Sequence, residues 1–187
     1  MRKVLIGVLS GLFLLGGCGE DGTVEESSSS QESIQEEVKT EPEALTLPPE
    51  NRPDEYTSDY DFDERLLLYL ESLDESSKKL MSEYEQAVID QEYLYSQEFA
   101  IQMDNIAYEL NGSLKGLRKS PLVRHKARVE ALEELTLVTA KYAEAAMLFS
   151  EGSIEKDEET FMWGADRLNQ AKSMGLNLKE KLDEAYN

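Results

Sequence analysis

The chain has 187 residues, a length that suits one domain with additional segments. Its 39 acidic and 19 basic residues give a formal charge of −20 at pH 7, and a field of this sign repels the phosphate backbone of nucleic acids. We therefore expect no nucleic-acid partner. The single cysteine, Cys18, has no second thiol in the chain with which to form a disulfide.

The first 18 residues have the organisation of a targeting segment. Arg2 and Lys3 form a short positive head, and residues 4–15 are almost entirely apolar. This apolar run is shorter than the roughly 20 residues of a membrane-spanning helix, but it suits the core of a signal peptide. Residues 15–18 read Leu-Gly-Gly-Cys, which resembles the lipobox of bacterial lipoproteins.

This resemblance covers residues 1–18 only, and it implies a defined processing. In bacterial lipoproteins the cysteine sulfur receives a diacylglyceryl group, the chain is cleaved directly before the cysteine, and lipid holds the product at the membrane. The resemblance therefore implies a signal peptide over residues 1–17, cleavage between Gly17 and Cys18, and a lipid (palmitate) anchor on Cys18. The implied location is the extracytoplasmic face of a bacterial cell membrane. An ordinary secretion signal or a short membrane anchor is the alternative.

Residues 18–58 are predicted to form a tether, in which a disordered acidic linker follows the lipidated cysteine. From residue 19 to 58 the chain has twelve acidic residues, two basic residues, a run of four serines and four of the five prolines. Such a segment buries too little apolar surface to offset the entropy lost on ordering. A flexible linker of about 40 residues has an end-to-end distance of roughly 35 Å, which separates the domain from the membrane.

Residues 59–187 are predicted to form an all-α domain. The first helix is expected over residues 59–89, because Ser58 suits the N-cap position and apolar residues recur at spacings of three and four. The second helix is expected over residues 92–118, because the apolar pattern changes phase near Asp90. One continuous helix through Asp90 is the alternative, since no Gly or Pro marks a break.

The third helix is expected over residues 121–150, with Ser120 as its N-cap and Pro121 at its first position. Gly152 and Ser153 are expected to end it and to begin the fourth helix, over residues 154–186.

Four helices of about 30 residues, each roughly 45 Å long, predict an up-down-up-down four-helix bundle. Gly164 and Gly175 lie inside the fourth helix, where each costs about 1 kcal/mol relative to Ala. We therefore expect a neighbouring backbone to approach that helix closely at these positions.

Leu94, Ile101 and Tyr108 form a second apolar stripe on the second helix, nearly opposite the stripe expected to face the core. A helix that is apolar on two sides either lies between neighbours or offers one face to a partner. We therefore predict an apolar partner face at these three residues.

Residues 115–128 form a basic segment that contains no acidic residue. One interpretation is a site for an anion or an acidic partner, such as lipid head groups or phosphate-rich wall polymers. The other is internal neutralisation by the acidic start of the first helix, which an up-down bundle places at the same end. The basic segment comprises Lys115, Arg118 and Lys119 at the end of the second helix, Arg124, Lys126 and Arg128 at the start of the third, and His125.

No metal or cofactor is expected. Asp59, Asp61 and Asp63 imitate the start of a calcium loop, but Glu64 replaces the required glycine and Leu70 replaces the final glutamate. The one histidine has no Glu three residues before it, which excludes the usual di-metal site of helical bundles. No nucleophile elbow or P-loop occurs.

These features predict a non-enzymatic, lipid-anchored module that binds an envelope protein or an anionic envelope polymer. A small-ligand binding protein with an internal cavity is the first alternative, and an enzyme with an unrecognised pair of carboxylates is the second. An exposed apolar strip on a closed bundle would favour the module, whereas a buried polar-lined cavity of several hundred Å³ would favour ligand binding. The sequence makes no prediction of the oligomeric state.

Overall fold

The computed structural model describes residues 57–121 and 123–186, in which the chain forms helices and short connections and no strand. The predicted signal peptide and nearly all of the predicted tether lie outside these residues. Within the described part of the chain, no helix combines the length and the apolar character that crossing a membrane requires. The helices are α2 (Asp59–Ile89), α3 (Gln91–Leu94), α4 (Gln97–Arg118), α5 (Lys126–Glu155) and α6 (Glu158–Tyr186).

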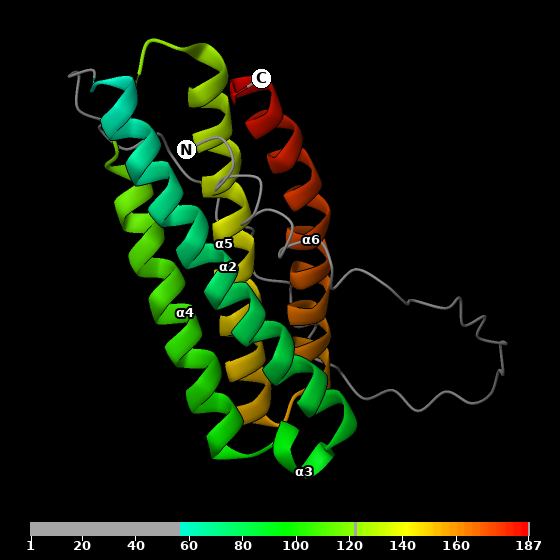
Figure 1. Ribbon diagram of the computed structural model, residues 1–187. Coiled ribbons are helices and arrows are strands. Elements are labelled where there is room, and N and C mark those ends of the chain that lie inside the picture. The colour runs from blue at the N-terminus through cyan, green and yellow to red at the C-terminus, as the bar shows by residue number, and fades with distance from the viewer. Residues whose placement is uncertain (1–56, 122, 187) are drawn as a thin grey trace, which may run out of the picture.

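The four long helices lie side by side and alternate in direction, while the short α3 turns the chain between α2 and α4 (Figure 1). The most extensive contacts are those of α5, which lies against α6 and α4, and α2 rests mainly on α4. The prediction of an all-α domain is confirmed, and the arrangement is compatible with a four-helix bundle.

Capping side chains separate α2 from α4, so the two do not form one continuous helix. The Asp90 carboxylate accepts hydrogen bonds from the amides of Glu92 and Tyr93, at 3.0 and 3.2 Å, and thereby begins α3. The Ser96 hydroxyl accepts a hydrogen bond from the Phe99 amide at 3.1 Å and begins α4. Side-chain acceptors at helix starts satisfy amides that lack a partner within the helix. The second long helix therefore begins at residue 97 rather than 92.

The expected start of the third long helix at residue 121 is wrong. The Ser120 hydroxyl donates to the Gly116 carbonyl at 3.1 Å, so it binds the end of α4 and does not cap α5. Helix α5 begins at Lys126, and the preceding residue, His125, makes no side-chain capping bond. Pro121 and Arg124 consequently lie in the connection rather than in the helix.

Gly152 does not end α5, which continues to Glu155. The left-handed residue that ends the helix is Lys156, with φ of 55°, and the Asp157 amide then donates to the Gly152 carbonyl at 2.9 Å. Helix α6 accordingly starts at Glu158 rather than at residue 154. A Cβ at residue 152 would lie 2.8 Å from the Phe161 backbone nitrogen. Glycine is therefore required here for the close approach of α6 rather than for a turn.

The helices α5 and α6 also meet closely at Gly164, as the sequence predicts for that position. A Cβ at this residue would lie 2.7 Å from the Phe149 ring and 3.3 Å from the Ala145 carbonyl oxygen. The Phe149 ring stacks on Tyr84 with 5.0 Å between centroids and lies 4.8 Å from the ring of Phe161. This aromatic group fills the core near α3 and joins α2, α5 and α6.

Replacing Gly152 by Ala is expected to lower the free energy of unfolding by about 1–3 kcal/mol, because the added methyl meets the backbone of α6. Gly112→Ala is the matched control, since a Cβ there has no atom within 4 Å. The control should raise the stability by about 0.5–1 kcal/mol through helix propensity. Urea unfolding followed by circular dichroism measures the free energy of unfolding of both variants. Equal changes in the two would contradict the close approach of α6 to Gly152.

Candidate functional site

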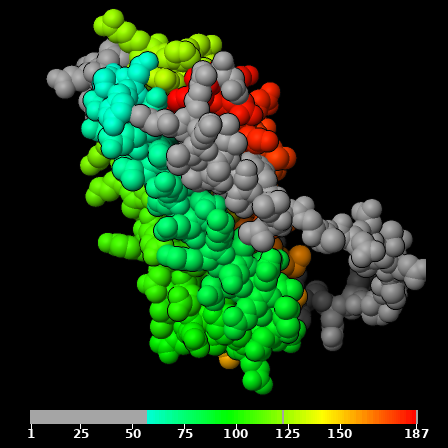
Figure 2. Space-filling view, in the orientation of Figure 1, coloured from blue at the N-terminus to red at the C-terminus, as the bar shows by residue number. Residues whose placement is uncertain are grey.

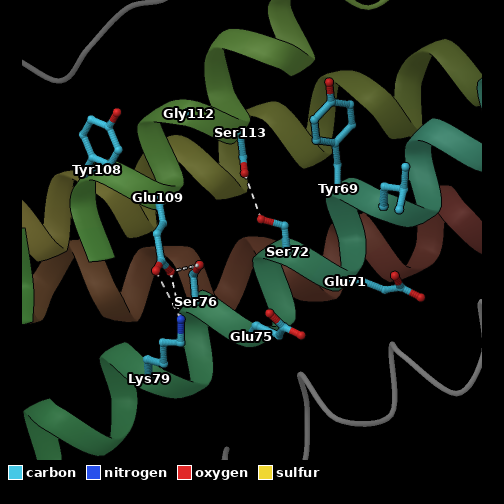
Figure 3. A pocket seen from close by; sticks show the side chains of 11 residues that line it. Tyr69, Glu71, Ser72, Glu75, Ser76, Lys79, Tyr108, Glu109, Gly112 and Ser113 are labelled. Carbon is cyan, nitrogen blue, oxygen red and sulfur yellow. Dashed lines mark hydrogen bonds and ion pairs between the residues drawn. The ribbon is translucent and has the colours of Figure 1, made fainter. Parts of the chain in front are cut away.

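An open groove of about 670 Å³ lies on the surface between α2 and α4 (Figure 3). The residues of α2 that line the groove recur at spacings of three and four, so they share one face of that helix. The lining residues of α4 occupy two successive turns and likewise share one face. The groove is lined by Leu68, Tyr69, Glu71, Ser72, Glu75, Ser76 and Lys79 of α2 and by Tyr108, Glu109, Gly112 and Ser113 of α4.

Small side chains form the middle of the groove and let the two helices approach. The hydroxyls of Ser72 and Ser113 form a hydrogen bond at 2.9 Å across the α2–α4 contact (Figure 3). Gly112 adds no side chain, and apart from its own turn of helix and its chain neighbours no protein atom would lie within 4 Å of a Cβ there. A seam built from serine and glycine leaves a hollow that leucines would fill, which explains why the groove forms here.

Carboxylates dominate the charge of the groove. Lys79 pairs with Glu109 across the two helices, with 3.0 Å between Nζ and Oε2, and the Ser76 hydroxyl donates to the same carboxylate at 3.3 Å. Within the described residues, the side chains of Glu71 and Glu75 make no ion pair or hydrogen bond. Three carboxylates against one ammonium give the groove a formal charge of −2.

Exposed hydrophobic side chains line the groove. Tyr108 on α4 is 82% exposed and Leu68 on α2 is 60% exposed. Tyr69 is half-buried instead, with ring atoms 3.0 Å from where a Cβ of Gly116 would lie. In the space-filling view, α2 and α4 occupy neighbouring parts of the same surface (Figure 2). The groove therefore combines apolar and aromatic surface with polar groups in one accessible place.

The structure separates the three residues of the predicted apolar partner face. Leu94 lies in α3, where it is half-buried against the core. Ile101 and Tyr108 do lie on the outer side of α4, with Ile101 48% exposed. Tyr108 belongs to the groove and Ile101 does not line it. Leu68, which sequence reasoning did not select, lies in the groove with Tyr108.

The basic segment is distributed over the end of α4, the connection and the start of α5. Lys115, Lys119, Arg124 and His125 are exposed, and Arg118 is half-buried at the end of α4. Lys126, whose side chain is 91% exposed, pairs with Glu130 at 3.2 Å on the same helix. Arg128 differs from these residues, because its side chain is directed into the domain.

Arg128 belongs to an ionic cluster that joins the starts of α2 and α5 to the end of α6. Its guanidinium forms ion pairs with Asp59 at 2.7 Å and with Asp63 at 3.2 Å. It also lies over the Tyr186 ring, 5.2 Å from the centroid, and the Tyr186 hydroxyl donates to Asp63 at 2.6 Å. For Arg128, the structure thus shows the internal neutralisation that the sequence offered as an alternative to an anion site.

A second group of charged side chains links α5 to α6 away from the groove. Glu144 accepts from Lys141 at 2.6 Å and pairs with Arg167 at 3.3 Å, and both Glu144 and Arg167 are buried. Glu144 thus joins Lys141 of its own helix to Arg167 of α6, so the group is structural. Within residues 57–121 and 123–186, no three His, Cys, Asp or Glu side chains gather closely enough to hold a metal ion.

Comparisons of the chain with known protein families, with curated sequences and with solved structures find no significant match.

Replacing Arg128 by Ala is expected to lower the free energy of unfolding by about 1–3 kcal/mol, because Asp63 then remains half-buried without its counter-charge. Lys126→Ala removes an exposed charge two residues away and should change stability by less than about 0.5 kcal/mol. Urea unfolding at low ionic strength compares the two variants. A loss for Arg128→Ala no larger than that of the control would refute a stabilising role for the cluster.

The cluster also predicts a loss of stability at alkaline pH. Burial raises the pKa of the Tyr186 hydroxyl above its usual value of 10.0, and the hydrogen bond to Asp63 raises it further. The stabilisation is therefore complete below about pH 10 and is lost as the pH rises through the folded-state pKa. Tyr186→Phe should lose about 1–2 kcal/mol at neutral pH and show a weaker decline above pH 10. Unfolding curves from pH 7 to 11 measure the stability at neutral pH and its decline at alkaline pH. If the decline in Tyr186→Phe equals that of the unchanged protein, the decline is due to other tyrosines.

Proposed function

We propose that the protein is a non-enzymatic lipoprotein of the bacterial envelope that presents an up-down-up-down four-helix bundle to a partner. In this proposal, residues 1–17 are removed, Cys18 carries the lipid, and residues 19–58 tether the bundle on the extracytoplasmic side. The support for the anchor is the Leu-Gly-Gly-Cys sequence at residues 15–18 after a short apolar run. The support for a partner is the surface between α2 and α4.

The observation that carries the proposed binding role is the open groove with Tyr108 and Leu68 exposed in it. Large exposed aromatic and aliphatic side chains beside a hollow are typical of surfaces that bind another macromolecule. The groove is open along the α2–α4 surface, whereas sites for small molecules usually enclose most of the ligand. The geometry therefore favours a partner that lies on the surface over a ligand held inside the bundle.

The basic segment is a weaker basis for a binding role than the groove. Arg128 is paired with two carboxylates of α2, and Lys126 is paired with Glu130. A partner of the basic segment would have to compete with these pairs or use the remaining exposed cations. No comparable competition is needed at Tyr108 and Leu68, which are already accessible.

The anchor is tested by replacing Cys18 with Ala. The variant should lose labelling by a palmitate analogue and should leave the membrane fraction, because one acylated residue holds the chain there. Ser28→Ala, which changes the linker without touching the cysteine, should keep both the label and the membrane location. Label that persists in Cys18→Ala would refute the proposed anchor.

The binding role is tested by placing a photo-crosslinking amino acid at position 108 in intact cells. A defined crosslinked product is expected, since Tyr108 lies in the proposed partner surface. The same amino acid at Met162, which is 61% exposed on α6, serves as the matched control and should give none. Products of equal yield at the two positions, or none at position 108, would contradict a partner at the α2–α4 face.

A further inference from the structure

We infer that the groove between α2 and α4 binds a basic polypeptide segment, rich in lysine or arginine. This inference deepens the proposed function, on which it rests, by naming the chemistry of the partner. It is carried by three properties of the groove: its charge, its aromatic and hydroxyl groups, and its open shape.

The charge of the groove selects a cationic occupant. Lys79 is engaged by Glu109 across the helices, so the one cation of the groove is already neutralised. Glu71 and Glu75 lie one turn apart on α2, are exposed, and have no side-chain partner within the described residues. A lysine or arginine placed between them gains two carboxylates without displacing an existing pair.

The same charge disfavours two occupants that the chain itself could supply. Residues 19–58 carry twelve acidic and two basic residues, and a second copy of the chain has a formal charge of −20. The linker is repelled by a groove of negative charge, and the net charge of a second copy opposes its approach, because like charges across an interface cost free energy. The complementary occupant is therefore a basic segment.

The groups lining the groove suit a peptide. Tyr69 and Tyr108 offer aromatic faces, which attract guanidinium and ammonium groups by about 0.5–1 kcal/mol at exposed sites. Ser72, Ser76 and Ser113 supply hydroxyls that both donate and accept, as the amide groups of a peptide backbone require. Tyrosine, serine and glycine together are residue types in which antibody paratopes are enriched, because they combine rigid contact area with adaptable hydrogen bonds.

The empty space beside Gly112 gives a direct way to occlude the groove. Apart from its own turn of helix and its chain neighbours, no protein atom lies within 4 Å of a Cβ at this position, and the residue is exposed inside α4. A tryptophan there replaces a helix-destabilising glycine and adds a large side chain to the lining of the groove. Gly112→Trp is thus expected to fold and to exclude an occupant.

The test is fluorescence anisotropy with the full chain in neutral detergent and a labelled Gly-Ser peptide that carries four arginines. A matched peptide with four glutamines in their place measures binding that does not need positive charge. We expect the arginine peptide to bind at least about tenfold more tightly, and its affinity to fall as salt is raised. Gly112→Trp should abolish this binding.

Two double variants distinguish the effect of the groove's charge on peptide binding from the effect of the net charge of the chain. Glu71→Gln with Glu75→Gln should weaken the arginine peptide by about tenfold, while Glu180→Gln with Asp183→Asn, which removes two charges from exposed positions of α6, should have little effect. Equal losses in both double variants, or unchanged binding in Gly112→Trp, would overturn the inference.

A different class of occupant has its own outcome. Binding of a labelled tetramer of N-acetylglucosamine that Gly112→Trp abolishes, with no binding of the arginine peptide, would overturn the inference in favour of a glycan. In that case crosslinking at position 108 is still expected, so the proposed function survives. Loss of the crosslink itself refutes the proposed function independently of either probe.

Discussion

The close approach of α5 and α6 is the constraint on which the rest of the domain depends. At Gly152 and Gly164 the two helices leave no room for a side chain, and the rings of Phe149 and Phe161 pack beside this contact. Because α5 is committed to α6 on one side and to α4 on the other, it occupies the centre of the domain. The helix α2 then completes the core from outside, mainly by contact with α4.

The way α2 completes the core explains the groove. Four of its leucines, Leu66, Leu70, Leu73 and Leu80, point inward and are almost fully buried, whereas Ser72 meets Ser113 of α4 nearer the surface. Hydroxyl contacts hold the helices in register but fill less volume than leucine contacts. The domain therefore has a well-packed interior and an unfilled outer seam, and the seam lies between the two exposed acids of α2 and the exposed tyrosine of α4.

The helices were largely predictable because their signals are local. The heptad-like spacing of leucines and the Ser58 cap lead to the observed bounds of α2, and the phase change near Asp90 marks the end of that helix. The errors have two different causes. Ser120 bonds to the carbonyl four residues before it instead of capping the next helix, and a serine side chain can make either of these local contacts. Gly152 is required by the approach of α6, which only the tertiary structure reveals.

The groove could not be read from the sequence for the same reason. Its two sides are separated by about 40 residues, and each side alone resembles an ordinary solvated helix face. Tyr108 was predicted as a partner residue from helical periodicity, but Leu68, on the other helix of the groove, was not, because the position of α2 against α4 is not a local property. Leu94 was misassigned because the periodicity continues through α3, although the chain turns there.

The ionic cluster of Arg128 has a mechanical consequence. Asp59 and Asp63, in the first turns of α2, are bound to Arg128 of α5. Asp63 is also bound to Tyr186, the last residue of α6. If the N-terminus is anchored as proposed, drag on a bound partner is transmitted through the chain that enters α2. The load would arrive at the point where three helices are joined, so it would be shared among them before α2 could peel away from the domain.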